Sequence, residues 1–571
     1  MKRSISAVVI IALAALCLFA LPAISANNNK SASKQITFTK DVAPIFFKNC
    51  AGCHRPNDIA PFSVLSYKDA RPWAKSIREK VLSREMPPWS ADPHFGEFSN
   101  NPRLSQTEVD AIVAWVDQGA KEGNILDLPP TPNFTEAWEI GKPDMVLAMP
   151  EEFSLPASGA DDYIYFRVPT NFTEDKWVQA VEFRPGNKRV VHHAVVFIEN
   201  LSMYEAAKAN ARRRGLNEQK APTLFEGPAG NIFRIDGTVR RVRDDAQVVD
   251  DGCGTPGGGG AGGNAGNMLL GVYAPGRNAD VWPAGTAKRI QAGSNLIFQM
   301  HYAKTTGRPE TDRTSVALVF AKSPVEKMIE SKDVANFFFK IPAGAENHEA
   351  TACYTFQRDV ELVNFMPHMH VRGKDMKYEV VYPDSRRETL LSVKYNFNWQ
   401  TLYKLKKPLP VPKGTKLVVT GHFDNSSKNK HNPDPTKTVR FGEPTYDEML
   451  VGFVDYIRDK PKDRIVAKID PKIYDDYVGE YAVGPGVNFT ILRDGDKLYF
   501  VSPRQPMIEA FPESETKFFF KVVDAEATFI RNERGAVNEL IFEINRQTIR
   551  AKKINKVAAG ESKRRIYGLF G

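Results

Sequence analysis

The chain has 571 residues and a mass of 63.9 kDa, several times the roughly 100–200 residues of a usual domain, so we expect several domains. Apolar residues make up 42% and charged residues 25%, values that argue against a disordered or fibrous chain. The formal net charge is +9 and the basic residues are scattered, so the composition does not indicate nucleic-acid binding.

The first 26 residues have the pattern of a bacterial export signal. Lys2 and Arg3 precede an apolar stretch over 8–20, and small residues over 23–26 offer a cleavage site. The stretch is short for a membrane-spanning helix, although an uncleaved anchor is the alternative interpretation. Cys17 follows a leucine where a lipoprotein signal needs a small residue, so we do not expect lipidation. We expect a periplasmic or secreted protein with no membrane span after signal cleavage.

Cys50, Cys53 and His54 form a C-x-x-C-H pattern. In the haem-attachment motif of this form, two thiols bond covalently to the haem and the histidine binds iron. We therefore expect a small all-α cytochrome c domain over 36–124. This attachment takes place after export, in agreement with the signal. The sequence therefore predicts one covalently attached haem c.

The sixth iron ligand is predicted to be Met86, which precedes two prolines. A thioether ligand raises the haem potential and suits electron transfer. His94 is the alternative ligand. Around the motif we expect one helix over 41–49, and a second over 105–119 that begins with a Ser-x-x-Glu capping box.

Between residues 124 and 455 the pattern favours β-strands. Runs over 188–198, 294–302 and 415–423 are rich in Val, Ile and Phe and are bounded by Gly, Pro and Asn. They predict an antiparallel β-sandwich architecture. The glycine-dense stretch over 251–266 is predicted to be a surface loop and not a phosphate-binding loop, because neither Lys-Ser/Thr nor a helix follows it.

Two cysteines, Cys253 and Cys353, lie outside the signal and the haem motif. In an oxidising compartment they can form a disulfide. A bridge closing about 100 residues could contribute up to ~4.7 kcal/mol through chain entropy. The alternative is two unrelated thiols.

Five of the ten histidines fall in three short motifs. These motifs are the adjacent pair His192 and His193, then His301 in Gln-Met-His-Tyr, and then His368 and His370 in H-x-H. Residues two apart on a strand point to the same face, so His368 and His370 can reach one metal ion.

In order and identity these motifs resemble the copper type II ascorbate-dependent monooxygenases, the family of peptidylglycine and dopamine hydroxylases. The resemblance covers roughly 138–458 and implies two antiparallel, jelly-roll-like β-sandwiches over 138–305 and 306–460, with one copper ion each. By position, it implies an electron-transfer copper on His192, His193 and His301 and an oxygen-activating copper on His368, His370 and Met449. Gln299 matches a position that supports the ligands in the family.

The ligand types fit this chemistry, because imidazole binds both copper oxidation states and a thioether favours Cu(I), the state that binds dioxygen. The chain departs from the peptidylglycine hydroxylases at Met366, where they carry a basic residue, so we do not expect it to bind a peptide carboxylate. It also lacks the disulfide-rich framework of the animal enzymes. His422 and His431 are expected to be structural and not direct ligands.

A further β-rich domain is expected over 466–571. Its strands are predicted over 487–492, 497–501, 517–522 and 539–544, joined in part by Asp-Gly and Arg-Gly turns. This region resembles a small lipocalin-like module found after bacterial hydrolase domains, which implies a barrel-like fold. It contains neither His nor Cys, so we expect no metal role.

Together these patterns predict an exported monooxygenase with two copper ions and one haem. It would insert one oxygen atom of dioxygen into a C–H bond of a small-molecule or peptide-like substrate. Electrons would come from an ascorbate-like donor or a redox protein, through a haem held by Cys50, Cys53, His54 and Met86. Two alternatives remain: a non-catalytic haem and copper electron relay, and a periplasmic copper-binding protein.

Overall fold

The computed structural model describes most of the chain between residues 35 and 555. The described ranges are 35–56, 58–134, 138–159, 162–199, 225–226, 232–233, 253, 268–275, 279–304, 306–336, 338–442, 444–460, 464–484, 487–501, 508–520, 525–544 and 547–555. The predicted export signal, and the predicted loop over 251–266 apart from Cys253, lie outside them. Among the helices of the described ranges, none has the length and apolar character that crossing a bilayer requires.

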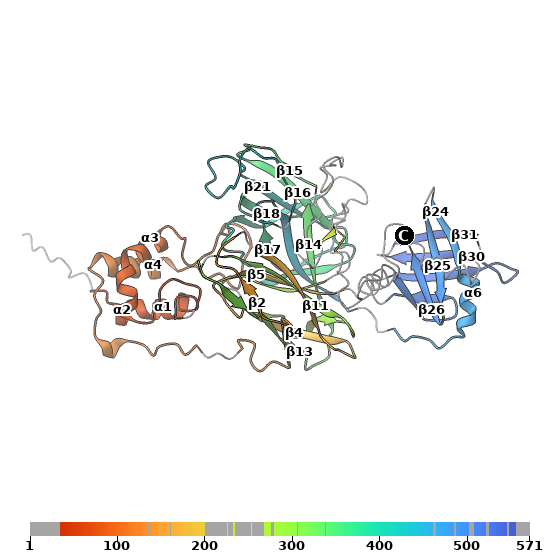
Figure 1. Ribbon diagram of the computed structural model, residues 1–571, viewed down its shortest axis with the longest axis horizontal. Coiled ribbons are helices and arrows are strands. Elements are labelled where there is room, and N and C mark those ends of the chain that lie inside the picture. The colour runs from red at the N-terminus through yellow and green to blue at the C-terminus, as the bar shows by residue number, and fades with distance from the viewer. Residues whose placement is uncertain are drawn as a thin grey trace, which may run out of the picture.

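Four units follow one another along the chain: a small helical unit, two β-sandwiches and a barrel. The helical unit lies at one end of the molecule, the β-sheets of the two sandwiches form its middle, and the barrel lies at the other end (Figure 1). The predicted class, mainly β with a small all-α domain and a barrel-like C-terminal domain, is confirmed.

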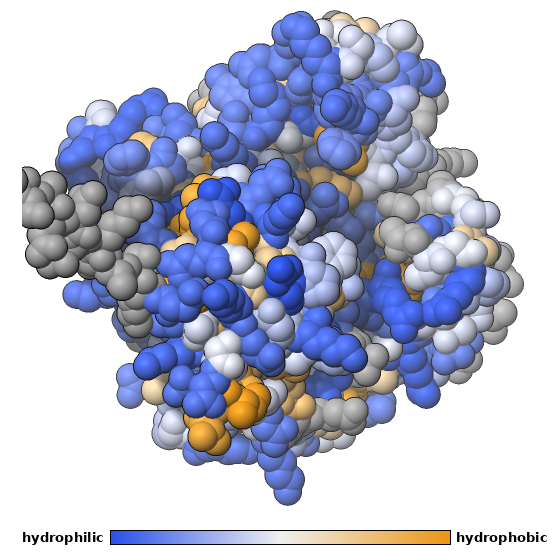
Figure 2. All heavy atoms as spheres, turned by 90° about the vertical axis from the view of Figure 1, so that its left-hand side faces the viewer, coloured by the Kyte–Doolittle hydropathy of each residue, from blue (hydrophilic) through white to orange (hydrophobic). Residues whose placement is uncertain are grey.

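The helical unit contains a helix on each side of the haem motif. Its elements are η1 Phe38–Val42, α1 Ala43–Asn49, α2 Tyr67–Ala70, η2 Arg71–Trp73, α3 Ala74–Leu82, α4 Gln106–Asp117 and η3 Ile125–Asp127. The predicted capping box begins α4, where Ser105 and Glu108 each accept a hydrogen bond from the other's backbone N–H. Phe46 and Trp115 pack edge to face in the core. The surface at this end is mostly hydrophilic, with scattered apolar patches (Figure 2).

The first sandwich packs the strand order β1-β13-β4-β10, with β9 beside β4, against β3-β11-β5-β8. Its strands are β1 Met145–Ala148, β3 Asp162–Pro169, β4 Lys176–Arg184, β5 Val191–Ile198, β8 Met268–Tyr273, β9 Ala279–Val281, β10 Thr286–Ile290, β11 Asn295–Tyr302 and β13 Ser315–Phe320. Small pairs are made by β2 Phe153–Leu155 with β12 Glu310–Asp312 and by β6 Phe225–Glu226 with β7 Ile232–Phe233. Buried side chains from both sheets, such as Val181 and Phe298, form its core.

The second sandwich packs β14-β23-β17-β20 against β16-β21-β18-β19. Its strands are β14 Lys327–Asn336, β16 His348–Thr355, β17 Val360–His368, β18 Gly373–Val381, β19 Arg387–Lys394, β20 Tyr403–Val411, β21 Lys416–Phe423 and β23 Leu450–Asp459, with the small pair β15 Lys340–Ile341 and β22 Val439–Arg440. Strands β10 and β14 pair in parallel, so one sheet runs through both sandwiches. Because β13 still pairs with β4, we infer that the boundary between the sandwiches falls between β13 and β14, after the predicted position at 305.

The three strands predicted over 188–198, 294–302 and 415–423 are present as β5, β11 and β21. Strand β5 begins at Val191 and not at residue 188. The reason is local, because the backbone N–H groups of Val190 and Val191 bond to the carbonyl of Asn187 and close a turn.

The C-terminal unit is a closed barrel formed by eight strands. They are β24 Gly479–Gly484, β25 Val487–Asp494, β26 Lys497–Val501, β27 Ile508–Pro512, β28 Lys517–Phe519, β29 Ala525–Arg531, β30 Val537–Ile544 and β31 Gln547–Asn555, preceded by η5 Pro471–Ile473 and α6 Tyr474–Tyr477. Closure pairs β24 with β31 and leaves no free strand edge. Tyr477 lies in the core of this unit and stacks on Phe529, with ring centroids 4.1 Å apart.

Cys253 and Cys353 form a disulfide, as one of the two sequence interpretations predicts. The bridge ties a residue 100 positions upstream to β16. Replacing Cys353 with alanine should lower the free energy of unfolding of the second sandwich by about 2–4 kcal/mol, because the unfolded chain regains the entropy of an open loop. Denaturant titration measures this loss. Cys253→Ala is the matched control and should show the same loss, whereas wild-type stability in both variants would contradict the prediction.

Candidate metal centre

Two strands of the first sandwich bring three histidines to one point. Strand β5 carries His192 and His193, and its antiparallel neighbour β11 carries His301 directly opposite His193. Their nearest ring nitrogens all lie within 4.8 Å of one another. Adjacent residues on a strand normally face opposite ways. Here the register shifts between His301 and Tyr302 and leaves His192 as an extra residue, and such a bulge lets both histidines face the same point.

The chemistry of these histidines fits a bound metal ion. His193 and His301 are only 3% and 0% exposed. Within the described part of the chain, both ring nitrogens of His193 are buried without a hydrogen-bond partner. A buried polar atom without a partner is costly, and a metal ion removes that cost. Burial, helped by the neighbouring His301, holds the pKa of His193 well below its usual range, so the ring is neutral and has a lone pair to donate.

The second sandwich supplies two more histidines. His368 ends β17, and His370 lies two residues beyond it; both are buried. The Nδ1 of His368 lies 2.7 Å from Oε1 of Gln400, and the Nδ1 of His370 lies 3.1 Å from the carbonyl oxygen of Asp447. A ring that donates from Nδ1 carries its lone pair on Nε2, the atom that can bind a metal. Burial lowers the pKa of His368 to about 4.

A buried carboxylate holds the H-x-H turn and Met449 together. Oε2 of Glu448 accepts from the backbone N–H of His370 at 2.9 Å and of Met449 at 3.3 Å, and Oε1 accepts from the N–H of Arg372 at 2.7 Å. Glu448 is fully buried, and burial raises its pKa to about 8 against the effect of these donors. Met449 is half-buried and comes directly after Glu448 in the chain. Because Glu448 is bound to the turn that carries His370, Met449 is held close to that turn.

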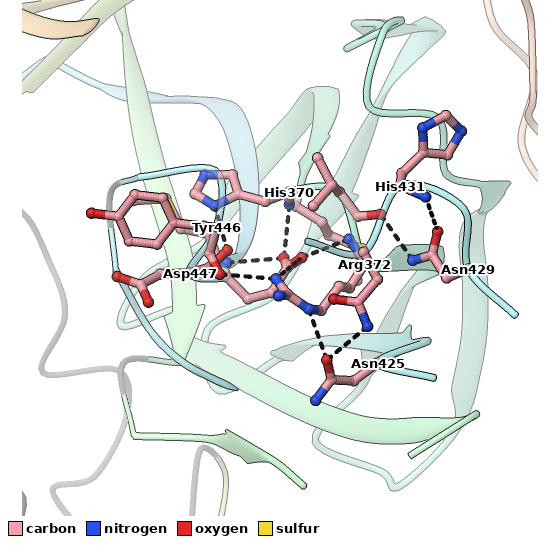
Figure 3. Close-up of polar contacts among 12 residues, drawn as sticks. His370, Arg372, Asn425, Asn429, His431, Tyr446 and Asp447 are labelled. Carbon is pink, nitrogen blue, oxygen red and sulfur yellow. Dashed lines mark hydrogen bonds and ion pairs between the residues drawn. The ribbon is translucent and has the colours of Figure 1, made fainter. Parts of the chain in front are cut away.

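Arg372 extends this network to the loop after β21 (Figure 3). Its guanidinium lies 3.9 Å from Oε1 of Glu448, and it donates to Oδ1 of Asn425 at 2.9 Å and to the carbonyl oxygen of Tyr446 at 3.0 Å. The sequence analysis missed Glu448, Arg372 and Gln400 as supporting residues. The Asp-Glu-Met run around Met449 is the signal that could have identified Glu448.

The two histidine groups form one continuous cluster. The ring centroids of His193 and His301 lie 4.7 Å apart, and those of His193 and His368 lie 5.8 Å apart. The ring of Phe397 stacks on His192 at 4.7 Å and lies 6.4 Å from His370. The fold thus brings the five predicted histidines into one cluster, and three of them, His192, His301 and His370, lie within 6.4 Å of the Phe397 ring.

The other residues singled out in the sequence lie around this cluster or away from it. Gln299 on β11 donates to the hydroxyl of Tyr165, and Met366 is buried in an apolar cluster. His422 contacts carboxylates through both ring nitrogens, Asp375 at 2.7 Å and Glu349 at 3.3 Å. His431 is exposed.

The haem motif lies at the end of α1. Cys50 and Cys53 are free thiols, and burial raises the pKa of Cys50 to about 12, so neither resembles a reactive thiolate. The Nδ1 of His54 lies 3.2 Å from the carbonyl oxygen of Phe62, which leaves the lone pair on Nε2. These groups fit a covalently attached haem with His54 on its iron.

The structure separates the two candidates for the sixth iron ligand. Met86 is half-buried in the loop after α3, where its N–H bonds to the carbonyl of Lys80 at 3.2 Å. The His94 side chain is 82% exposed, and its Nδ1 lies 2.6 Å from Asp92. Met86 is therefore the more buried of the two candidates.

Comparisons with known proteins agree with this geometry. Residues 335–478 match the model of the copper type II ascorbate-dependent monooxygenase C-terminal domain, residues 40–120 match cytochrome c, and residues 463–555 match a domain of unknown function (DUF3471). Penicillin-binding protein 4* of Bacillus subtilis is 30% identical over 105 residues, 18% of this chain. The chain spans about a fifth (21%) of that relative's length. The likeness of the barrel to lipocalins stays a prediction.

Solved structures share little with the chain as a whole. The major capsid protein P2 of bacteriophage PM2 aligns over 56% of this chain and 98% of its own, with 6% identity and a TM-score of 0.21. The VP2 particle protein of infectious bursal disease virus aligns over 56% and 82%, with 8% identity and a TM-score of 0.14. Scores this low establish no common fold. The family matches identify a copper monooxygenase-like domain over residues 335–478 and a cytochrome c domain over residues 40–120.

Proposed function

We propose that the protein is an exported copper monooxygenase that hydroxylates a C–H bond of an organic substrate. Dioxygen would supply one atom to the product and one to water, with the uptake of two electrons and two protons. The single observation that carries this proposal is the cluster of five histidines, four of them buried, at the junction of the two sandwiches, in a chain that also contains a cytochrome c domain.

The proposed copper ligands fall into two sets, one from each sandwich. His192, His193 and His301 would hold the electron-transfer copper, as three imidazoles around one point suit an ion that cycles by one electron. His368, His370 and Met449 would hold the oxygen-activating copper, in which the thioether favours Cu(I). When bound, copper supplies dioxygen activation and one-electron redox chemistry.

The chain's own residues would prepare this site. Gln400 fixes the ring of His368 through Nδ1, and Asp447 does the same for His370, so that both rings keep their lone pairs on Nε2. Glu448 fixes the turn that carries His370 relative to Met449. Phe397 covers the imidazoles and limits the access of water.

A covalent haem on Cys50, Cys53, His54 and Met86 would be the electron inlet. Fusion to the copper domains replaces diffusional encounter with a high local concentration of donor. We propose that it delivers one electron at a time to the His192, His193 and His301 site. An ascorbate-like donor or a redox protein would reduce the haem.

Aerobic turnover with labelled dioxygen tests the proposal. The holoprotein should contain two copper ions and one haem and should transfer one labelled atom into an organic product. His301→Ala should lose this activity and one copper ion, while His431→Gln, on the surface, is the matched control and should retain both. Oxygen uptake at background level with both coppers bound would favour a relay, and copper binding without any redox turnover would favour a storage protein.

Glycine-extended peptides should be poor substrates. Met366 stands where a base would pair with a peptide carboxylate, and it is buried among apolar side chains. The nearby cation Arg372 is already engaged by Glu448, Asn425 and Tyr446. Product analysis after incubation with such a peptide measures this, and efficient amidation would show that the prediction is wrong.

A further inference from the structure

The segment that follows the Met86 loop leaves the helical unit and joins the second sandwich. We call residues 89–100 the haem strap. Ala91 pairs in antiparallel fashion with Val393 on β19, and Phe98 pairs with Leu405 on β20. Strands β19 and β20 are the outer strands of the two facing sheets. The haem strap therefore covers one open side of the sandwich, where unpaired strand edges would otherwise remain.

The contact is tightly packed. Trp89 and Ala91 are 7% and 2% exposed and belong to the core of the second sandwich. The rings of Trp89 and Tyr403 lie 4.7 Å apart, and the Oγ of Ser90 lies 3.0 Å from the Tyr403 hydroxyl. Gly96 has a φ of +68°, and a Cβ there would lie 2.5 Å from the carbonyl oxygen of Leu390. Such a fit is that of a domain interior and not of a flexible tether.

The haem strap holds both ends of one loop. We call residues 395–402, between β19 and β20, the linking loop. On one side of it, the N–H of Lys394 bonds to the carbonyl of Ser90 at 3.2 Å. On the other, Nδ2 of Asn100 donates to the carbonyl of Leu402 at 2.7 Å, and Oδ1 of Asn100 accepts from the N–H of Lys404 at 2.9 Å.

The opposite side of the linking loop contacts the histidine cluster. Phe397 stacks on His192, with interplanar angle 20°, and Gln400 binds His368 at 2.7 Å. One short loop therefore lies between the haem strap and both histidine groups. Nothing in the spacing of the sequence motifs predicts this position.

A second contact fixes the haem motif itself. Asp58, four residues after His54, is 8% exposed at its side chain and lies 2.8 Å from Nζ of Lys188. Lys188 lies in the turn that leads into β5, four residues before His192. Arg55 completes this group at 2.8 Å from Asp58. The cytochrome unit is thus attached to the first sandwich by the haem motif and to the second by the haem strap.

We propose that the haem strap and the linking loop hold the haem at a fixed position against the copper-binding histidines, with Trp89, Tyr403 and Phe397 as positioning residues for electron transfer. This rests on the haem and copper assignments of the proposed function but not on hydroxylation. In each transfer one electron would leave ferrous haem, which would become ferric, and would reduce one cupric ion to cuprous. No bond would form and no proton would move. A one-electron reductant of the ascorbate type would restore the haem, and the transfer would need no domain movement.

Pulse radiolysis of the anaerobic full-length holoprotein tests this without substrate. A radiolytic reductant reduces the haem, and its reoxidation by cupric ions is followed at the haem absorption band. We expect a rate independent of protein concentration, and no such phase in copper-free protein. Trp89→Ala should slow it by about tenfold or more, because small displacements of reacting groups are costly. Trp89→Phe, which keeps a ring, should restore most of the rate, and Trp177→Ala, on β4, should leave it unchanged.

Two further measurements separate positioning from other effects. The haem midpoint potential and the copper content should match the wild type in Trp89→Ala, so that only the transfer rate changes. In the wild-type protein the backbone amides of Asp92, Lys394 and Lys406 should exchange hydrogen as slowly as those of the core strands. The hydrogen-exchange measurement uses only the wild-type protein, so it still tests the proposal if Trp89→Ala fails to fold.

Several outcomes would overturn the proposal. The first is a transfer rate that depends on protein concentration, and the second is a folded Trp89→Ala protein with the wild-type rate. The third is hydrogen exchange at the amides of Asp92, Lys394 and Lys406 that is as fast as in exposed loops. If only the proposed hydroxylation were wrong, the phase of electron transfer from haem to copper would persist, but labelled dioxygen would give no hydroxylated product.

Discussion

Replacing Met449 with alanine should abolish hydroxylation while the haem stays attached and the fold stays intact. The thioether is the ligand expected to favour Cu(I) at the oxygen-activating site, and alanine has no donor atom to replace it. The backbone of the 447–449 segment should hold its position, because the N–H of residue 449 and the carbonyl of Asp447 keep their bonds to Glu448 and His370. Only the ligand is removed.

Three measurements on Met449→Ala check this. Label from dioxygen should no longer appear in product, bound copper should fall from two ions toward one, and the haem spectrum should not change. Met145→Ala is the matched control, since Met145 is also half-buried but lies on β1 of the first sandwich. A Met449→Ala protein with full hydroxylase activity would remove this methionine from the site.

Replacing Glu448 with alanine should have the largest effect on stability. Two buried backbone N–H groups, those of His370 and Arg372, and the half-buried N–H of Met449 would lose their acceptor. The guanidinium of Arg372 would lose its buried partner. We expect a loss of about 3–5 kcal/mol in the free energy of unfolding, together with loss of the oxygen-site copper.

The conservative change Glu448→Gln keeps part of the hydrogen bonding. Glutamine keeps one acceptor oxygen, so it should lose less stability than alanine, at about 1–3 kcal/mol. Denaturant titration and copper analysis measure both variants. The control is Glu349→Ala, because the Glu349 side chain is 64% exposed. If Glu448→Ala unfolded at the wild-type denaturant concentration, the network around Arg372 would not support the site.

Local patterns in the sequence were sufficient for much of the architecture. The Ser-x-x-Glu motif predicts the start of α4, because capping involves residues three apart. Val-rich and Ile-rich runs bounded by turn residues predict β5, β11 and β21, because a strand's character depends on its own side chains. The haem motif and the H-x-H pair are likewise contained within a few residues.

The arrangement of the site depends on pairing between distant segments. The alternation of side chains along a strand predicts that the adjacent residues His192 and His193 face opposite ways. They face the same point because of a register shift against β11, which lies about a hundred residues further along the chain. Gln400, Glu448 and Phe397 reach the histidines from loops whose course is set by the packing of the second sandwich.

The residues that can carry the chemistry are identifiable from local motifs: two cysteines and a histidine for haem, and five histidines and a methionine for copper. How these groups lie relative to one another depends on the packing of distant segments. The tertiary structure brought the two histidine groups into one cluster and placed Trp89 and Ala91 of the haem strap in the core of the second sandwich, beside residues about 300 positions away in the sequence. The physical reason is that a ligand motif depends only on the spacing of residues along the chain. Which distant segments come into contact depends instead on the burial of apolar surface and on hydrogen bonding to the edges of strands.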